Sequence, residues 1–209
     1  MDTQEPDTEV LIEHARGGDG AARQALLARH RTRLRRMVAC RLDRRVAARV
    51  DPSDVVQEAL AEAAHRLSDY LRTRPLPFYP WLRRLTWEHL LRLQQRHLAL
   101  KRSVLREEPQ GYAPSDESVQ ELADRLAAPS GTPSNRLIRE ELYARVRQAL
   151  TELADAEREL LLMRYVEQLP VADIAAVLEI SEAAVKMRHR RALDRMSRLL
   201  AGDGAGGLG

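Results

Sequence analysis

The sequence predicts an all-α protein of two helical domains joined by a flexible linker, with a helix-turn-helix in the second domain. Hydrophobic residues make up 44% of the 209 positions and aromatic residues 4%, and abundant Ala, Leu, Arg and Glu favour helix over sheet. Apolar residues recur at helical spacing along most of the chain. This regularity fades where Pro, Ser and Gly gather. We therefore predict a first domain over 1–106, an acidic linker over 107–133, a second domain over 134–200 and a disordered tail over 201–209.

Charge is distributed unevenly along the chain, although the formal net charge is only +3. Arginine dominates three stretches, Arg23–Arg49, Arg83–Arg106 and Lys186–Arg198, while acidic residues gather in Glu107–Asp124. This segregation predicts three basic surfaces separated by an acidic connector. For any one stretch taken alone, a solvated helix face is an equally common reading.

The cysteine count and the hydropathy of the sequence argue against a disulfide-bonded, zinc-binding or membrane-spanning protein. Cys40 is the single cysteine, so no disulfide can form within the chain and no Cys/His set has the spacing of a structural zinc site. The polar N-terminal residues have no signal-peptide core, and no stretch approaches the roughly 20 apolar residues of a membrane span. We expect a cytoplasmic protein with no metal, no cofactor and no membrane association.

The first domain is predicted to open with two helices. A short amphipathic helix from Glu9 is stopped by Gly17 and Gly18, and Asp19 is placed to cap a second helix. That helix is predicted to be long, because apolar residues continue at steps of three and four as far as Val38.

Proline marks the next boundaries. Pro52 between two capping residues predicts the start of a third helix that runs to about Tyr70. The three prolines of Arg74–Pro80 predict a stiff loop. Helical spacing resumes over Trp81–Arg106 with arginines filling the gaps.

The second domain is predicted to contain four helices. They cover Ser134–Leu150, Asp155–Tyr165, Val171–Leu178 and Glu182–Leu200. A further short helix around Val119–Leu126 is compatible with the linker composition.

The last two predicted helices have the layout of a helix-turn-helix, with Ser181 as the cap of the second helix. Val185, Ala192 and Met196 share one face with His189 and Leu193, and we expect that face to pack inward. The opposite face would enter the major groove and read bases, and the flanking Arg188 and Arg191 are better placed for phosphates. An ordinary helical hairpin with a charged outer face is the alternative. The predicted base readers are Glu182, Ala183, Lys186, Met187 and Arg190.

These residues also carry a resemblance to a family. The segment ALTELADAERELLLMRYVEQLPVADIAAVLEISEAAVKMRHRRALDRM resembles the C-terminal domain of the sigma factors of bacterial RNA polymerase, which reads minus-35 promoter DNA. The family often has Gly where this chain has Glu179, which must then either tolerate an unusual backbone conformation or shift the turn slightly. The resemblance implies that the minus-35 contacts are made by Ser181, Glu182, Ala183, Lys186, Met187, Arg188, Arg190 and Arg191.

A second motif, DPSDVVQEALAEAAHRLSDY, resembles the family's helix that binds core polymerase. The resemblance assigns that contact to Asp54, Val55, Gln57 and Glu58. Asp54 and Glu58 lie one helical turn apart and would offer carboxylates to a basic partner surface. The preference of helix N-termini for acids explains Asp54 nearly as well but does not explain Gln57.

A third segment, PFYPWLRRLTWEHLLRLQQRHLALKR, resembles the family's promoter-melting helix. Aromatic rings stack on unpaired bases at about 1–3 kcal/mol each, and arginines follow the backbone of a single strand. Trp81 is an equally good core residue, and the proline-rich loop could capture a flipped base or simply connect helices. Trp87 and Glu88 depart from the family's usual Arg and Asn. The implied minus-10 contacts are Phe78, Tyr79, Trp81, Arg83, Arg84, Trp87 and Arg92.

With only two sigma domains, the chain resembles the compact extracytoplasmic-function type. This implies a non-enzymatic initiation factor that is monomeric when free and binds core RNA polymerase, promoter DNA and an anti-sigma protein. The main alternative is a free-standing helix-turn-helix regulator that acts as a dimer on palindromic half-sites. An enzyme is the least favoured reading, because no nucleophile with a base and no phosphate loop stands in a recognisable context.

Overall fold

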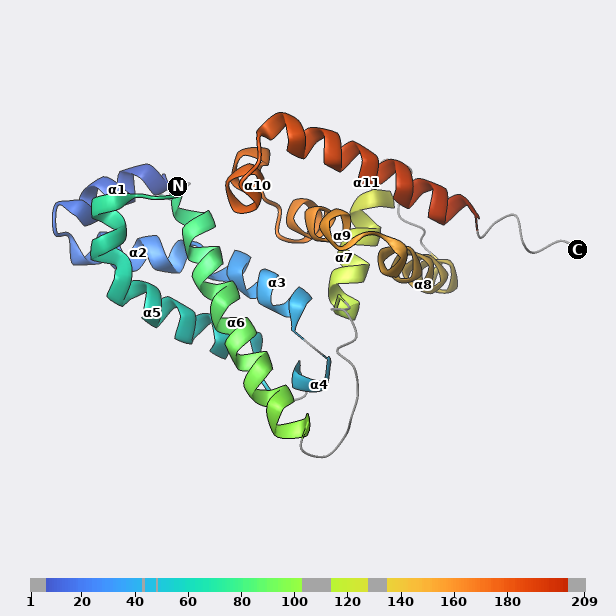
Figure 1. The fold of residues 1–209 in the computed structure, drawn as a ribbon, viewed down its shortest axis with the longest axis horizontal. Coiled ribbons are helices and arrows are strands. Elements are labelled where there is room, and N and C mark those ends of the chain that lie inside the picture. The colour runs from blue at the N-terminus through green and yellow to red at the C-terminus, as the bar shows by residue number, and fades with distance from the viewer. Residues whose placement is uncertain (1–6, 43, 48, 103–113, 128–134, 203–209) are drawn as a thin grey trace, which may run out of the picture. The chain divides into compact units, whose positions relative to one another are not determined.

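The computed structural model describes residues 7–42, 44–47, 49–102, 114–127 and 135–202, and these residues form helices and turns with no β-strand among them (Figure 1). The all-α prediction is therefore confirmed. The chain divides into two units, one of residues 1–38 and 45–108 and one of residues 39–44 and 109–209.

The first part of the chain forms six helices, named here in chain order. They are α1 (Thr8–Arg16), α2 (Gly20–Arg29), α3 (Arg31–Arg41), α4 (Arg44–Ala47), α5 (Pro52–Thr73) and α6 (Phe78–Arg102). Between α1 and α2, Gly18 adopts a φ of 92°. The Asp19 side chain then accepts hydrogen bonds from the backbone N–H groups of Ala21 at 2.8 Å and Ala22 at 3.1 Å. The predicted stop and cap are both confirmed.

The single long helix predicted after Asp19 is wrong in one respect, because it breaks at His30. This residue has φ −96° and ψ 1° and separates α2 from α3. Its ring lies 5.5 Å from the ring of Phe78 and 5.4 Å from that of Tyr79. Periodicity could not show the break, because apolar spacing continues across it.

The two longest helices of the first unit, α5 and α6, pack against each other (Figure 1). Asp51 caps α5 by accepting from the backbone N–H of Ser53 at 2.7 Å, a bond that lowers the pKa of the Asp51 carboxyl. Helix α6 begins at Phe78 and includes Pro80, so the predicted loop is shorter than expected. Proline fits there because the N–H groups of a first helical turn have no intrahelical partner.

The core of the first unit is mainly apolar and draws on α1, α2, α3, α5 and α6. Its buried residues include Ile12 of α1, Leu26 of α2, Leu34 of α3, Ala59 of α5, and Leu82 and Leu90 of α6. Of the neighbouring His89 and Leu90 on α6, Leu90 is fully buried whereas His89 is half-buried. The predicted end of this helix at Arg106 lies outside the described residues.

The second unit consists of five α-helices and one π-helical turn within the described ranges. They are α7 (Asp116–Ala127), α8 (Arg136–Glu152), α9 (Asp155–Leu161), η2 (Leu162–Val166), α10 (Val171–Leu178) and α11 (Glu182–Gly202). The sequence predicted a regular helix as far as Tyr165, whereas the last turn is π-helical. Most of the predicted tail lies outside the described residues.

Helix α7 packs into the second unit although its sequence was predicted to be part of a linker. Val119 and Leu122 are fully buried in one apolar cluster with Val146, Leu150 and Leu162. A short helix is only marginally stable by its intrinsic propensity, and packing of its apolar face against the unit supplies the rest of its stability. The linker prediction is thus wrong for residues 116–127, while 107–113 and 128–133 lie outside the described residues. None of the described helices is long and apolar enough to cross a membrane.

Candidate nucleic-acid interface

The helix-turn-helix of the second unit is formed by α10 and α11. Helix α10 ends at Glu179, which adopts the left-handed conformation with φ 54° and ψ 41°. The backbone N–H of Ile180 then donates to the carbonyl of Ala175 at 3.1 Å and closes the turn. Ser181 caps α11, because its hydroxyl accepts from the N–H of Ala184 at 3.2 Å. The expected unusual backbone at Glu179 and the expected cap are both present.

The inward and outward faces of α11 are those predicted. Val185, Ala192 and Met196 are buried against the unit. His189 is half-buried, its Nε2 lies 3.2 Å from the Tyr165 hydroxyl, and burial lowers the pKa of its imidazole. This supports a packing role for His189. All eight residues predicted to contact minus-35 DNA are exposed: Ser181, Glu182, Ala183, Lys186, Met187, Arg188, Arg190 and Arg191.

The outward face of α11 carries four cations without a neutralising carboxylate. Among the residues that the structure describes, no ion pair engages Lys186, Arg188, Arg190 or Arg191. A neighbour of Arg190 is the Met187 sulfur, 3.7 Å from its Nη2. Positive charge that is not compensated within the protein remains available to phosphate oxygens. We call these four residues and the other four exposed positions the α11 face.

The predicted polymerase-binding residues lie in the first two turns of α5. Asp54, Gln57 and Glu58 are exposed, whereas Val55 is 1% exposed and packs into the core. Val55 therefore cannot contact a partner directly, and its prediction is corrected. The helical period places it on the inward face, one residue from Asp54.

Glu58 is held by α6. Its Oε2 lies 2.9 Å from Nε2 of His89, and one turn later Oε2 of Glu62 lies 2.9 Å from Nη2 of Arg92. A shallow groove along these side chains is lined by Glu58, His89, Arg92, Gln95 and Arg96. The sequence reasoning missed Glu62 and His89. The four-residue spacing of Glu58 and Glu62 on one helical face was the signal available for Glu62.

The predicted minus-10 residues separate into a buried group and an accessible group. Phe78 is 2% exposed, Tyr79 3% and Arg83 5%, so these three belong to the core and not to a surface. Their assignment to DNA contact is corrected for that reason. Arg84 and Arg92 are exposed, and Trp81 and Trp87 are half-buried.

The rings of Tyr70, Phe78 and Trp81 pack together at the start of α6. The ring of Tyr70 lies 4.4 Å from that of Trp81 at an interplanar angle of 30°, and 5.3 Å from that of Phe78 at 67°. The guanidinium carbon of Arg33 lies 4.8 Å from the centre of the Tyr79 ring. Trp81 therefore packs against Tyr70 and is half-buried.

Comparisons with known proteins agree with this arrangement. Residues 143–196 match the family model described as sigma-70, region 4. The probable RNA polymerase sigma factor RfaY of Xanthomonas campestris pv. campestris is 32% identical over 156 residues, which are 74% of this chain and 34% of that protein. The RNA polymerase sigma-H factor of Pseudomonas aeruginosa is 26% identical over 200 residues, 96% of each chain.

A solved structure is also similar. The structure of CnrH in complex with the cytosolic domain of CnrY matches with a TM-score of 0.53 and 25% identity, covering 94% of this chain and 99% of CnrH. Fold and site together define a two-unit helical protein of the helix-turn-helix class. In sequence and fold the chain is similar to sigma factors of bacterial RNA polymerase, and its residues 143–196 carry the region 4 match. It spans about a third of the length of RfaY and nearly all of sigma-H.

Proposed function

We propose that this protein directs core RNA polymerase to promoters through three surfaces, and that it does so as a non-enzymatic, cytoplasmic factor. The α11 face would read minus-35 DNA, the accessible residues of α6 would hold the separated minus-10 strand, and the first turns of α5 would bind core polymerase. The observation that carries the proposal is the fully exposed α11 face with its four uncompensated cations.

The minus-10 role rests on the accessible residues alone. Trp81 and Trp87 offer aromatic surface for stacking on unpaired bases, and Arg84 lies beside them on α6 with its guanidinium exposed. Within the described ranges, Arg84 forms a single exposed ion pair, with Nε 3.3 Å from Oε1 of Glu88. Such pairs are weak in water, so a phosphate group can displace the carboxylate.

The α5 surface supports binding to a partner with basic groups. Asp54 and Gln57 are exposed, and Glu58 faces the shallow groove with its side chain 62% exposed. The exposed Glu58–His89 pair contributes little in water, so a partner arginine can compete for the carboxylate. We propose in addition that an anti-sigma protein regulates this chain, by analogy with the solved complex of CnrH with CnrY.

Replacing Gln57 and Glu58 together by Ala should weaken binding to core polymerase by about tenfold, the loss typical when interface side chains are truncated. Helical content should not change, because both side chains are exposed. Fluorescence titration of labelled protein with core enzyme measures the affinity. Asp69→Ala is the matched control, since Asp69 is an exposed acid on the same helix and is paired with Arg72. Equal affinities for wild type and the double variant would remove the α5 assignment.

Replacing Arg188 and Arg191 together by Ala should lower the salt dependence of promoter binding. If each guanidinium neutralises one phosphate, the slope of log K against log salt should fall in magnitude by about 2. The measurement is fluorescence anisotropy of a promoter fragment with polymerase carrying either form, because the contribution of core enzyme cancels in the difference. Arg136→Ala on α8 is the control and should leave the slope unchanged. An unchanged slope in the double variant contradicts phosphate contact by α11.

A further inference from the structure

The loop between α5 and α6, residues 74–77, is fixed at both of its ends. The backbone N–H of Arg74 donates to the carbonyl of Tyr70 at 2.7 Å. The Tyr70 hydroxyl in turn donates to the carbonyl of Leu76 at 3.0 Å, and burial raises the pKa of that hydroxyl. Two prolines within the loop restrict its remaining torsions. The loop is therefore held in one conformation by the helix that precedes it.

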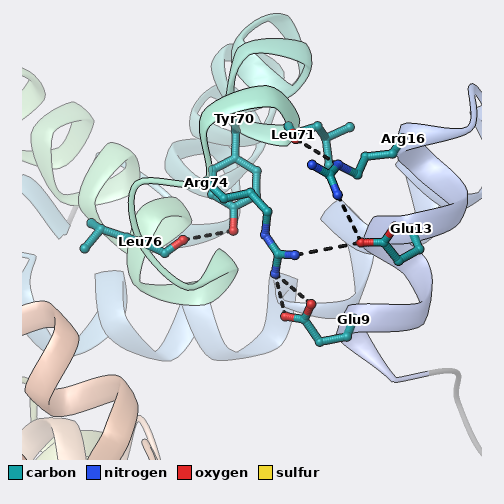
Figure 2. A network of polar contacts seen from close by, with 7 residues as sticks. All are labelled: Glu9, Glu13, Arg16, Tyr70, Leu71, Arg74 and Leu76. Atoms are coloured by element: carbon teal, nitrogen blue, oxygen red, sulfur yellow. Dashed lines mark hydrogen bonds and ion pairs between the residues drawn. The ribbon is translucent and has the colours of Figure 1, made fainter.

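Arg74 ends α5 in a conformation that usually selects glycine. Its φ of 42° and ψ of 58° lie in the left-handed region, which is unfavourable for a side chain with a Cβ atom. The side chain has a partner that glycine could not have. Nη2 of Arg74 lies 2.8 and 2.7 Å from the two carboxylate oxygens of Glu9, and Nη1 lies 3.9 Å from Glu13 (Figure 2). The hydrogen bond to Glu9 raises the pKa of the Arg74 guanidinium.

A second arginine joins the same two helices in the opposite direction. Nε of Arg16 on α1 donates to the carbonyl of Leu71 in the last turn of α5 at 3.1 Å, and its Nη1 donates to Glu13 at 3.3 Å (Figure 2). Helix α1 therefore contacts the end of α5 through one arginine from each helix. We call Glu9, Glu13, Arg16 and Arg74 the α1 brace.

The braced loop adjoins the proposed minus-10 surface. Tyr70 both fixes the Leu76 carbonyl and stacks on Trp81, so a shift of the loop would move the support beneath Trp81. We infer that Arg74 and Glu9 are positioning residues: α1 braces the α5–α6 loop so that the loop and Trp81 meet the separated promoter strand in one orientation. This inference rests on the proposed function of α6.

The substitution Arg74→Gly separates a positioning role from a merely structural one. Glycine suits the left-handed backbone, so the unfolding midpoint of the first unit should stay close to that of wild type. Trp fluorescence reports this unit, because both tryptophans of the chain lie in α6. Open-complex formation by polymerase carrying the variant should nevertheless slow by about two- to fivefold, the range that a partly exposed ion pair can supply. Affinity for core enzyme should not change.

Glu9→Gln tests the same contact from the other helix without altering the backbone at Arg74. It should slow promoter opening to a similar extent, and the double variant should be no slower than either single variant, because both remove one interaction. Arg72→Ala is the control, since Arg72 is exposed in the same turn and pairs with Asp69 and not with α1 among the described residues. The measurement is the rate of opening, followed by a fluorescent base analogue in the minus-10 region.

The outcomes are distinguishable. Wild-type opening rates for Arg74→Gly and Glu9→Gln, or additive effects in the double variant, overturn the brace. If Arg74→Gly lowers the unfolding midpoint, the test uses Glu9→Gln alone and the double variant Glu9→Gln with Arg74→Lys. The brace then requires that Glu9→Gln slows opening and that the double variant is no slower. Trp81→Ala separates this inference from the proposed function. If Trp81→Ala slows opening and the brace variants do not, only the brace fails; if Trp81→Ala is also without effect, the α6 surface itself is wrong.

Discussion

Replacing Leu122 by Ala should destabilise the second unit by about 2–5 kcal/mol, the range for truncating a fully buried leucine. Leu122 is 0% exposed and lies in the cluster that contains Val146, Leu150 and Leu162. The substitution leaves a cavity that its neighbours fill only in part. Far-ultraviolet circular dichroism in urea measures the free energy of unfolding, and Trp fluorescence follows the first unit as an internal reference.

The matched control for this variant is Leu126→Ala one turn later on α7. Leu126 is only partly buried against the same cluster, so its truncation should cost distinctly less. If α7 were a solvated part of a linker, both substitutions would have the same small effect. Equal free energies of unfolding for Leu122→Ala and wild type would therefore remove α7 from the second unit.

Lowering the pH from 7 to 5 should destabilise the first unit by about 2 kcal/mol through His30 alone. The pKa of the His30 imidazole is lowered from its ordinary 6.5 to about 4, mainly by burial and to a smaller extent by the positive charges of Arg33 and Arg29. Above pH 6.5 the imidazole is neutral in the folded and unfolded chain. As the pH falls, the unfolded chain binds the proton first, so stability decreases until the pH reaches about 4.

The variant His30→Leu should lose this part of the pH dependence. His30 is 7% exposed, and its Nε2 has no hydrogen-bond partner among the described residues, so an apolar replacement should be tolerated at pH 7. Urea unfolding followed by Trp fluorescence at pH 5 and pH 7 gives the difference between the two proteins. Because the other histidines are common to both proteins, their titration cancels. If the free energy of unfolding changed equally with pH in wild type and His30→Leu, His30 would have the same pKa in the folded and unfolded chain.

Much of the helix-turn-helix could be predicted from the sequence because it depends on local chemistry. The cap at Ser181 and the bounds of α10 follow from residues within one or two turns. The two faces of α11 follow from the 3.6-residue period, which placed Val185, Ala192 and Met196 inward. The cap at Asp51 is local for the same reason. Each of these features is decided by residues that are neighbours in the chain.

The sequence could not distinguish buried from accessible aromatic residues around α6. Phe78, Tyr79 and Trp81 are neighbouring aromatic residues that the sequence does not distinguish. Of the three, Trp81 alone is partly exposed. The difference arises in part from His30, which lies 48 residues before Phe78 in the chain and packs against the rings of Phe78 and Tyr79. Burial is a property of which surfaces meet, and no local pattern encodes it.

By itself the sequence determined the caps at Asp19, Asp51 and Ser181, the bounds of α10 and which face of α11 points outward. Only the tertiary structure decided that α7 joins the second unit, that Val55 and Arg83 are buried, and that Glu9 of α1 holds Arg74 at the end of α5. Helix caps, prolines and hydrophobic periodicity depend on residues that are close together in the chain, so they can be recognised in the sequence. Contacts across 65 residues, as between Glu9 and Arg74, exist only once the helices have packed.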